Sequence, residues 1–190
     1  MHVNKSKGFT LIELVIGIMV FTIALVSFMS LIVPQATRSI DPIFQVRAAE
    51  LGQSLLNEIS SKSFDEHSNR TGGLFRCNDT SQINCTNSEE LGDDNETRDN
   101  YNDVDDYKGL VEADENIKNA LDNVITLEEK PLYNGFSVAV EVIYDDNMDG
   151  INDAISQNDP TYIGNTKLIT VTVTTPNNED IIFSTFRSNF

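Results

Sequence analysis

The stretch KGFTLIELVIGIMVFTIALVSFMSLIV, residues 7–33, decides how the rest of this chain can fold. From Phe9 to Val33 it runs for 25 residues, and Glu13 is its only charged side chain. As an α-helix this run would be about 37 Å long, enough to cross a bilayer core of about 30 Å. An acidic residue inside a membrane span is costly and by default marks a functional site. The run therefore predicts a membrane-spanning helix that carries one functional charge.

A signal peptide and a plain anchor both fit this apolar run less well. A secretory signal peptide has an apolar core of about 7–15 residues and a small-residue cleavage site. The run is longer, and Val33-Pro34-Gln35 is not such a site. A plain single-pass anchor does not explain Glu13. Because Lys5 and Lys7 precede the run and a strongly acidic chain follows it, we expect a cytoplasmic N-terminus and an exported remainder.

The residues Lys7-Gly8-Phe9-Thr10-Leu11-Ile12-Glu13-Leu14 resemble the class III signal of type IV prepilins and type II secretion pseudopilins. The resemblance implies a leader of residues 1–8, a peptidase cut between Gly8 and Phe9, and N-methylation of Phe9. It also implies that Glu13 pairs with the N-terminal amine of a neighbouring subunit in a fibre. A buried carboxylate is much less costly when it is paired. The alternative is a Glu near the membrane boundary that reaches the interface alone.

The same resemblance implies partners and a location. The prepilin peptidase would process the chain, an inner-membrane assembly platform would receive it, and the other pilins of the fibre would bind it. Before assembly the apolar segment, residues 9–33, would hold the chain in the bacterial inner membrane with the C-terminal domain in the periplasm. Afterwards the chain would be part of a cell-surface pilus.

The composition narrows the function of the exported part. The 190 residues carry a net charge of −17, which argues against nucleic-acid binding and against a polybasic contact with anionic lipid. The two histidines, His2 and His67, exclude most histidine-based catalysis, and no nucleotide-binding or hydrolase motif is present. We therefore predict a protein that is not an enzyme and needs no cofactor.

A second helical segment follows the apolar run, in the part of the chain from residue 34 to 64. Its apolar residues recur three or four positions apart, which predicts an amphipathic helix packed on a sheet. Asp41-Pro42 has the form of a helix start, so we expect the chain to bend or break near residues 39–41. The residues of the apolar stripe are Ile40, Phe44, Ala48, Leu51, Leu55 and Ile59.

The segment 65–134 is acidic and irregular, and we predict a variable loop with a short helix at residues 114–124. Charge runs of this kind are usually solvated. Cys77 and Cys85 lie within it, and outside the cytoplasm they are expected to form a disulfide; two free thiols are the alternative. The run 102–107, Asn-Asp-Val-Asp-Asp-Tyr, is dense enough in oxygen atoms to hold a cation.

The C-terminal part, residues 135–190, has the alternation of β-strands. Apolar residues alternate with others along 136–144 and 169–174, and a turn at 176–179 leads into 181–187. This pattern predicts a three-stranded antiparallel sheet with one buried face, covered by the amphipathic helix. The predicted fold class is therefore α+β, and this is the pilin fold that the N-terminal resemblance implies.

An Asp-rich loop, residues 145–166, joins the first two of these strands. Its spacing matches the first nine positions of an EF-hand calcium loop, where alternate oxygen atoms point inward and a glycine permits the sharp turn. The twelfth position is Ser156 in place of the expected Glu, so calcium would need a further ligand. The alternative is a wet, Asx-rich turn. The candidate ligands of a structural calcium are Asp145, Asn147, Asp149, Ile151 and Asp153.

Several stretches further resemble the MshD-type minor pilins of the mannose-sensitive haemagglutinin (MSHA) pilus: 41–53, 64–66, 102–107 and 186–190. This resemblance implies a minor pilin that helps initiate or modulate assembly of a type IV pilus and surface attachment. Two further functions remain open at this point. One is a pseudopilin of type II secretion, and the second is a calcium-dependent binding module displayed on the fibre.

Overall fold

A computed structural model describes residues 8, 10–38, 41–68, 76–79 and 83–189. The chain divides into two units with the boundary between Ile43 and Phe44. Most of the first unit is helix α1, Leu11–Arg38, in which every side chain from Leu11 to Ser30 is exposed. This 20-residue stretch is long and apolar enough to cross a membrane, as predicted. An apolar stretch of this length with exposed side chains needs lipid or neighbouring subunits around it.

Helix α2, Asp41–Ser60, begins where the Asp-Pro pair predicts a helix start. The expected break lies between Arg38 and Asp41, at residues 39–40, which are outside the described part of the chain. The predicted apolar stripe is confirmed for its described members. Phe44 is half-buried, and the remaining four are buried in one core: Ala48, Leu51, Leu55 and Ile59.

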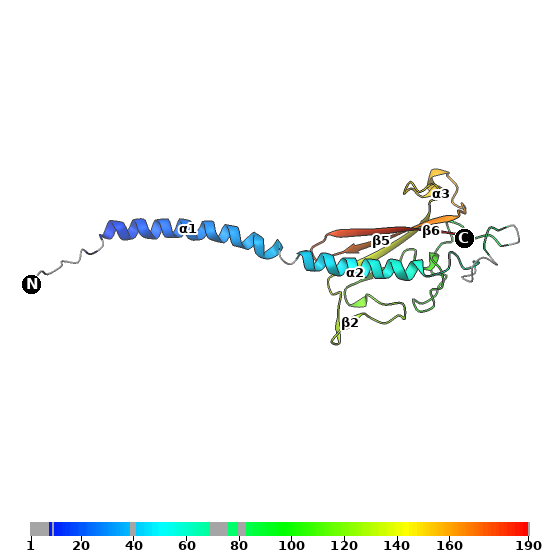
Figure 1. Cartoon of the computed structure of the whole chain (residues 1–190), viewed down its shortest axis with the longest axis horizontal. Helices are drawn as coiled ribbons and strands as arrows, with labels where there is room; N and C mark the ends of the chain where they lie inside the picture. Colours follow the sequence, from blue (N-terminus) through cyan, green and yellow to red (C-terminus); the bar gives the residue numbers. More distant parts are fainter. Residues whose placement is uncertain (1–7, 9, 39–40, 69–75, 80–82, 190) are drawn as a thin grey trace, which may run out of the picture. The chain divides into compact units, whose positions relative to one another are not determined.

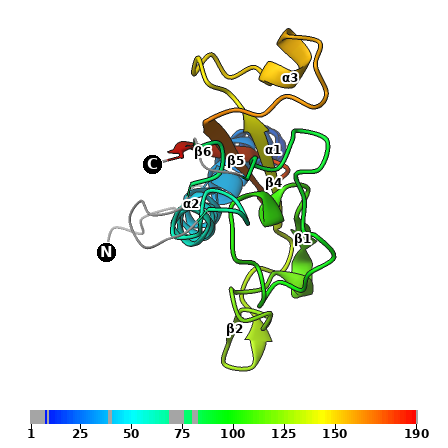
Figure 2. The same ribbon diagram turned by 90° about the vertical axis from the view of Figure 1, so that its right-hand side faces the viewer.

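The second unit is built on a four-stranded antiparallel sheet in the order β1-β4-β5-β6 (Figures 1 and 2). Its strands are β1 (Val111–Ala113), β4 (Ser137–Tyr144), β5 (Thr166–Thr174) and β6 (Asp180–Ser188). The long strands pair over their whole length, with Val140 opposite Val171 and Val171 opposite Phe183. Alternate residues of β4 and β5 are buried, because successive side chains of a strand point to opposite faces.

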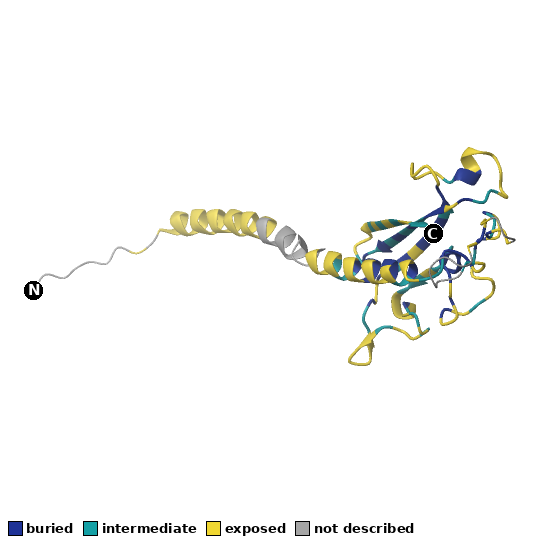
Figure 3. Ribbon diagram, turned by 45° about the vertical axis from the view of Figure 1, so that its right-hand side comes forward, coloured by how far each residue is buried: buried dark blue, intermediate teal, exposed yellow. Residues whose placement is uncertain are grey.

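The core lies between α2 and the inner face of this sheet (Figures 1 and 3). Inward residues of β4 and β5 meet the stripe of α2 there: Val138, Val140, Val142, Ile169, Val171 and Val173. A smaller core at the start of β5 contains Phe64, Leu91, Tyr144 and both cysteines. The predicted α+β fold, a helix packed on an antiparallel sheet, is confirmed.

Two predictions about the chain between helix and sheet are wrong. The sheet has four strands, because β1 of the acidic segment joins β4 at its edge, with Glu112 opposite Val138. Residues 114–124 do not form a helix: a single 3₁₀ turn, η2 (Asp114–Asn116), is followed by a bridge between Lys118 and Val124. Asp114 has a positive φ of 55°, which α-helical geometry does not allow.

The acidic segment contains further short elements (Figure 2). They are η1 (Asp105–Tyr107) and a small hairpin of β2 (Thr126–Leu127) and β3 (Lys130–Pro131). A further short helix, α3 (Asp153–Ser156), lies outside this segment, in the Asp-rich loop. The buried Arg98 fixes the segment against α2 because its guanidinium lies 3.1 Å from Glu58 and over the ring of Tyr107. Much of this segment is therefore packed structure and not a solvated loop.

Candidate functional site

The N-terminal site is built by Thr10 and Glu13 at the start of α1. The backbone N–H and the hydroxyl of Thr10 both donate to Oε2 of Glu13, at 3.0 and 2.9 Å. The backbone N–H of Glu13 donates in return to Oγ1 of Thr10 at 3.3 Å. This is a capping box, in which each side chain satisfies a free N–H of the first helical turn.

The capping box gives Glu13 a local role that the sequence-based prediction did not include, although the Thr-x-x-Glu spacing carries the signal. The carboxylate is held at the helix N-terminus, where the helix dipole favours negative charge. Of the predicted cleavage site, Gly8 is exposed, whereas Phe9 lies outside the described residues. In the sequence, Glu13 lies four residues after Phe9, where a new N-terminus would form.

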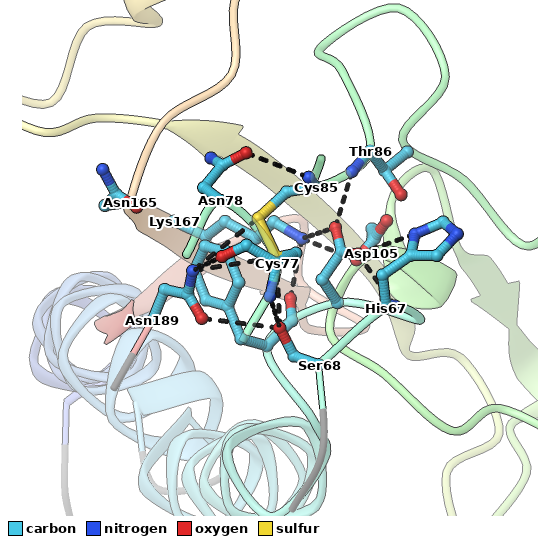
Figure 4. Close-up of a disulfide and its surroundings, with 12 residues drawn as sticks. His67, Ser68, Cys77, Asn78, Cys85, Thr86, Asp105, Asn165, Lys167 and Asn189 are labelled. Atoms are coloured by element: carbon cyan, nitrogen blue, oxygen red, sulfur yellow. Dashed lines mark hydrogen bonds and ion pairs between the residues drawn. A yellow bond between two sulfur atoms is a disulfide. The ribbon is translucent and has the colours of Figure 1, made fainter. Parts of the chain in front are cut away.

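The predicted disulfide joins Cys77 to Cys85, with both cysteines buried (Figure 4). Asn189, near the C-terminus, contacts the disulfide: its Nδ2 donates to the carbonyl of Cys77 at 2.9 Å. The N–H of Cys85 donates to Oδ1 of Asn78 at 3.1 Å. The disulfide closes a short loop of the acidic segment, and the hydrogen bond from Asn189 ties this loop to the residue that follows β6.

A buried cluster of charges lies beside the disulfide (Figure 4). The amine of Lys167, at the start of β5, is fully buried and lies 2.6 Å from Oδ1 of Asp105 and 3.6 Å from Oδ2 of Asp65. It also donates to the carbonyl of Phe64 at 2.7 Å. The oxygen-rich run 102–107 does face a cation, and in this structure the cation is the chain's own Lys167.

Asp103 completes this cluster from the same short run. Its Oδ1 accepts the N–H groups of Asp105 and Asp106, and its side chain is hydrogen-bonded to that of Asp105. Burial, with the neighbouring Asp105 charge, raises the pKa of Asp103 to about 9. The raised pKa favours the neutral acid form of Asp103 at pH 7.

The Asp-rich loop folds as a tight turn that its own backbone stabilises. Both oxygens of the buried Asp145 accept N–H groups, from Asp149 at 3.0 Å and from Gly150 at 2.8 Å. Oδ2 of the buried Asp153 accepts the N–H of Asp146 at 2.7 Å. Gly150 has a φ of +81°, as the sharp turn requires. The predicted ligand positions are therefore brought into one loop.

Whether the Asp-rich loop can bind a cation depends on which of its oxygen atoms are available and on whether its negative charges are already paired. Asn147 bonds to Asp149 through both its amide groups, and Asp149 is exposed at the loop tip. Among the described residues, no Lys, Arg or His forms an ion pair with Asp145 or Asp153, although both carboxylates are buried. Ser156, at the twelfth position, donates to Asp153 and supplies only a hydroxyl.

One other group of metal-binding residue types converges within the described residues: Asp65, Cys77 and Cys85. The two sulfur atoms are bonded to one another, so neither is a thiolate that could bind a metal. The oxygens of Asp65 are in addition occupied by the N–H groups of His67 and Thr86, at 3.0 and 2.8 Å. This group is a structural cluster around the disulfide.

Comparison with known proteins identifies the N-terminal segment. Residues 3–29 match the family model described as the prokaryotic N-terminal methylation motif, the segment shared by type IV pilins and pseudopilins. No curated protein and no solved structure matches the chain. The match spans Gly8, Thr10 and Glu13, and it ends within α1.

Proposed function

We propose that this protein is a pilin-type structural subunit, cut after Gly8 and assembled into a fibre through α1. The observation that carries the proposal is the methylation motif at the start of a helix whose apolar side chains are exposed from Leu11 to Ser30. A folded second unit with its own core follows the helix, as a fibre subunit needs. The inner membrane would hold α1 before assembly, and neighbouring subunits would cover it afterwards.

The chemistry of assembly centres on Glu13. Cleavage after Gly8 would create an amine on Phe9, directly before Thr10 of the capping box. In the membrane the capping box supplies Glu13 with two hydrogen bonds but with no cation. The amine of a neighbouring subunit would supply the missing positive charge, and this pairing would favour entry into the fibre in one register.

Within this class we propose a minor pilin of an MSHA-like type IV pilus, which helps initiate or modulate assembly and surface attachment. The support is the resemblance of residues 41–53, 64–66, 102–107 and 186–190 to the MshD-type minor pilins. The packed acidic segment gives such a subunit a distinctive surface for its neighbours.

The test compares fibres and secretion in a strain lacking this protein. Loss or reduction of surface fibres, restored by the intact chain, with the chain recovered in the fibre fraction sheared from cells, is the expected result. Accumulation of folded secretory proteins in the periplasm, with normal surface fibres, would instead identify a type II secretion pseudopilin. Normal fibres and normal secretion would contradict the proposal.

Calcium binding by the Asp-rich loop is a second candidate function, for a binding module displayed on the fibre. The observation in its favour is that Asp145 and Asp153 are buried carboxylates without a cationic partner among the described residues. Asp145, Asn147, Asp149, the carbonyl of Ile151 and Asp153 would supply the oxygens, as in known calcium loops.

A further inference from the structure

The amine of Lys167 and the carboxyl of Asp105 lie 2.6 Å apart in the interior, and they come from segments 62 residues apart in the sequence. We propose that these two groups condense to an amide in the folded protein, which cross-links strand β5 to η1 by an intramolecular isopeptide bond. The proposal does not depend on the function above, because the cross-link forms within one chain.

The pair lies in a nearly dry part of the interior. The side chains of Lys167 and Asp105 are 0% and 3% exposed, and the aromatic rings of Phe64 and Tyr144 have centroids 4.5 and 5.5 Å from the amine. Two charges in such a dry site keep a large desolvation cost even when they are paired. The amide product carries neither charge and removes the desolvation cost of the ion pair.

Asp103 supplies the acid that the reaction needs. Its Oδ1 accepts the N–H groups of Asp105 and Asp106 at 2.9 and 3.2 Å, which fixes the carboxyl beside Asp105, and burial raises its pKa to about 9. A hydrogen bond to the carbonyl oxygen of Asp105 draws electron density from Cγ and stabilises the negative charge that develops during attack. The reacting groups are held in contact by the fold, which removes much of the entropic barrier.

The step balances without an oxidant or a further reactant. One proton passes from the ammonium to the carboxylate of Asp105, which leaves a neutral amine beside a neutral acid. Nζ of Lys167 bonds to Cγ of Asp105, and Asp103 gives its proton to the departing hydroxyl. The second proton of the nitrogen passes by way of the former carbonyl oxygen of Asp105 to Asp103. The Cγ–O bond breaks and one water leaves. Asp103 ends as it began, and the new amide retains one N–H.

The remaining contacts of the Lys167 amine fit the amide product and favour Asp105 over Asp65 as the reacting carboxyl. The carbonyl of Phe64, 2.7 Å from Nζ, is placed to accept the single N–H of the amide. Asp65 is a second carboxylate near the amine, but it lies at 3.6 Å. Its two oxygens already accept N–H groups from His67 and Thr86. Asp105 is therefore the carboxyl that reacts.

The decisive experiment is intact-mass analysis of the full chain purified in detergent. The mass is expected to be lower than the sequence mass by one water, beyond the two hydrogens lost in the disulfide and any N-terminal processing. Proteolysis after reduction should then yield one branched peptide that joins the Lys167 and Asp105 fragments. A mass that shows only the disulfide, with Lys167 open to an amine reagent after denaturation, would overturn the proposal.

Three variants test whether the amide forms between Lys167 and residue 105 and whether its formation needs the acid of Asp103. Asp105→Asn should form the same amide with loss of ammonia in place of water, so its final mass equals that of the cross-linked wild type. Lys167→Arg cannot form the amide and should keep the full sequence mass apart from the disulfide. Asp103→Asn removes the acid proton while keeping the shape, and should leave most of the chain without the cross-link. If a variant does not accumulate, the mass of the wild type still decides.

Discussion

Thr10 and Glu13 cap one another at the first turn of α1, with three hydrogen bonds between the two residues. The carboxylate therefore serves the helix before any other subunit is present. This arrangement separates two roles of Glu13, hydrogen-bond acceptor and negative charge, which substitutions can test one at a time.

Replacing Glu13 tests which role governs assembly. Gln at this position can still accept the hydrogen bonds of the capping box, but it has no charge. We expect Glu13→Gln and Glu13→Ala both to insert in the membrane and both to be strongly depleted from sheared fibres, because neither can pair with an amine. Quantitative immunoblots of membrane and fibre fractions measure the effect.

Thr10→Val is the matched control for this experiment. It removes the hydroxyl of the capping box and leaves the charge of Glu13, so its incorporation should stay close to that of the wild type. If Glu13→Gln assembles normally and Thr10→Val does not, capping governs assembly, and the proposed pairing is wrong.

Gly52 of α2 allows the helix to approach the edge strand β6. A Cβ at this position would fall inside van der Waals distance of the ring of Phe183. Overpacking typically costs about 1–3 kcal/mol, and the better helix propensity of Ala returns up to about 1 kcal/mol. We expect Gly52→Ala to lower the free energy of unfolding by about 1–2 kcal/mol.

The partner substitution checks the cause of this loss. Phe183→Leu makes room at the same contact, so adding Gly52→Ala to it should cost less than in the wild type. Denaturant unfolding of the wild type, both single variants and the double variant gives the coupling. Stabilisation by Gly52→Ala alone would show that the helix is not so close to β6.

The buried acid Asp103 makes stability depend on pH. Its folded pKa, about 9, lies above the ordinary value of 3.8, so between these values the folded state binds one more proton than the unfolded state. The free energy of unfolding should therefore fall as pH rises through this window, by up to about 1.4 kcal/mol per pH unit for one proton. Below the lower value and above the upper one, this contribution is flat.

Asp103→Asn should remove this part of the slope, whatever it does to the absolute stability. The exposed Glu115→Gln is the control and should leave the slope as it is in the wild type. The measurement is denaturant unfolding at several pH values between about 5 and 9, inside the window where the protonation of the two states differs. An unchanged slope in Asp103→Asn would contradict the assignment of a neutral Asp103.

Calcium binding predicts a rise in melting temperature. A ligand that binds only the folded state stabilises it in proportion to the logarithm of its concentration above Kd. We expect millimolar calcium to raise the Tm of the full chain in detergent, magnesium to do less, and Asp149→Asn to reduce the effect. No shift in the wild type would exclude a structural calcium in this loop.

The periodic parts of the fold could be predicted from the sequence. The spacing of Ala48, Leu51, Leu55 and Ile59 identifies the buried face of α2, and the alternation along β4 and β5 identifies the sheet. The disulfide followed from the expected export of the domain. Each of these features depends on the local sequence or on the cellular compartment of the domain, so a single sequence is enough to predict it.

The parts that depend on long-range packing could not be predicted. Strand β1 has three residues and exists because it pairs with β4, so it has no pattern of its own. Lys167 looks like an ordinary surface lysine at the start of a strand, and its burial depends on Asp105 and Asp65, which lie far earlier in the chain. Residues 114–124 likewise do not form the predicted helix, because tertiary packing outweighs their local helix propensity.

The central claim is that α1 enters a fibre after its leader has been removed. The most direct test is the intact mass of the protein recovered from fibres sheared from the cell surface. We predict a chain that begins at Phe9 and carries one added methyl group on its N-terminal amine. A fibre-borne chain that still begins at Met1, or that is cut at a site other than Gly8-Phe9, would contradict this claim.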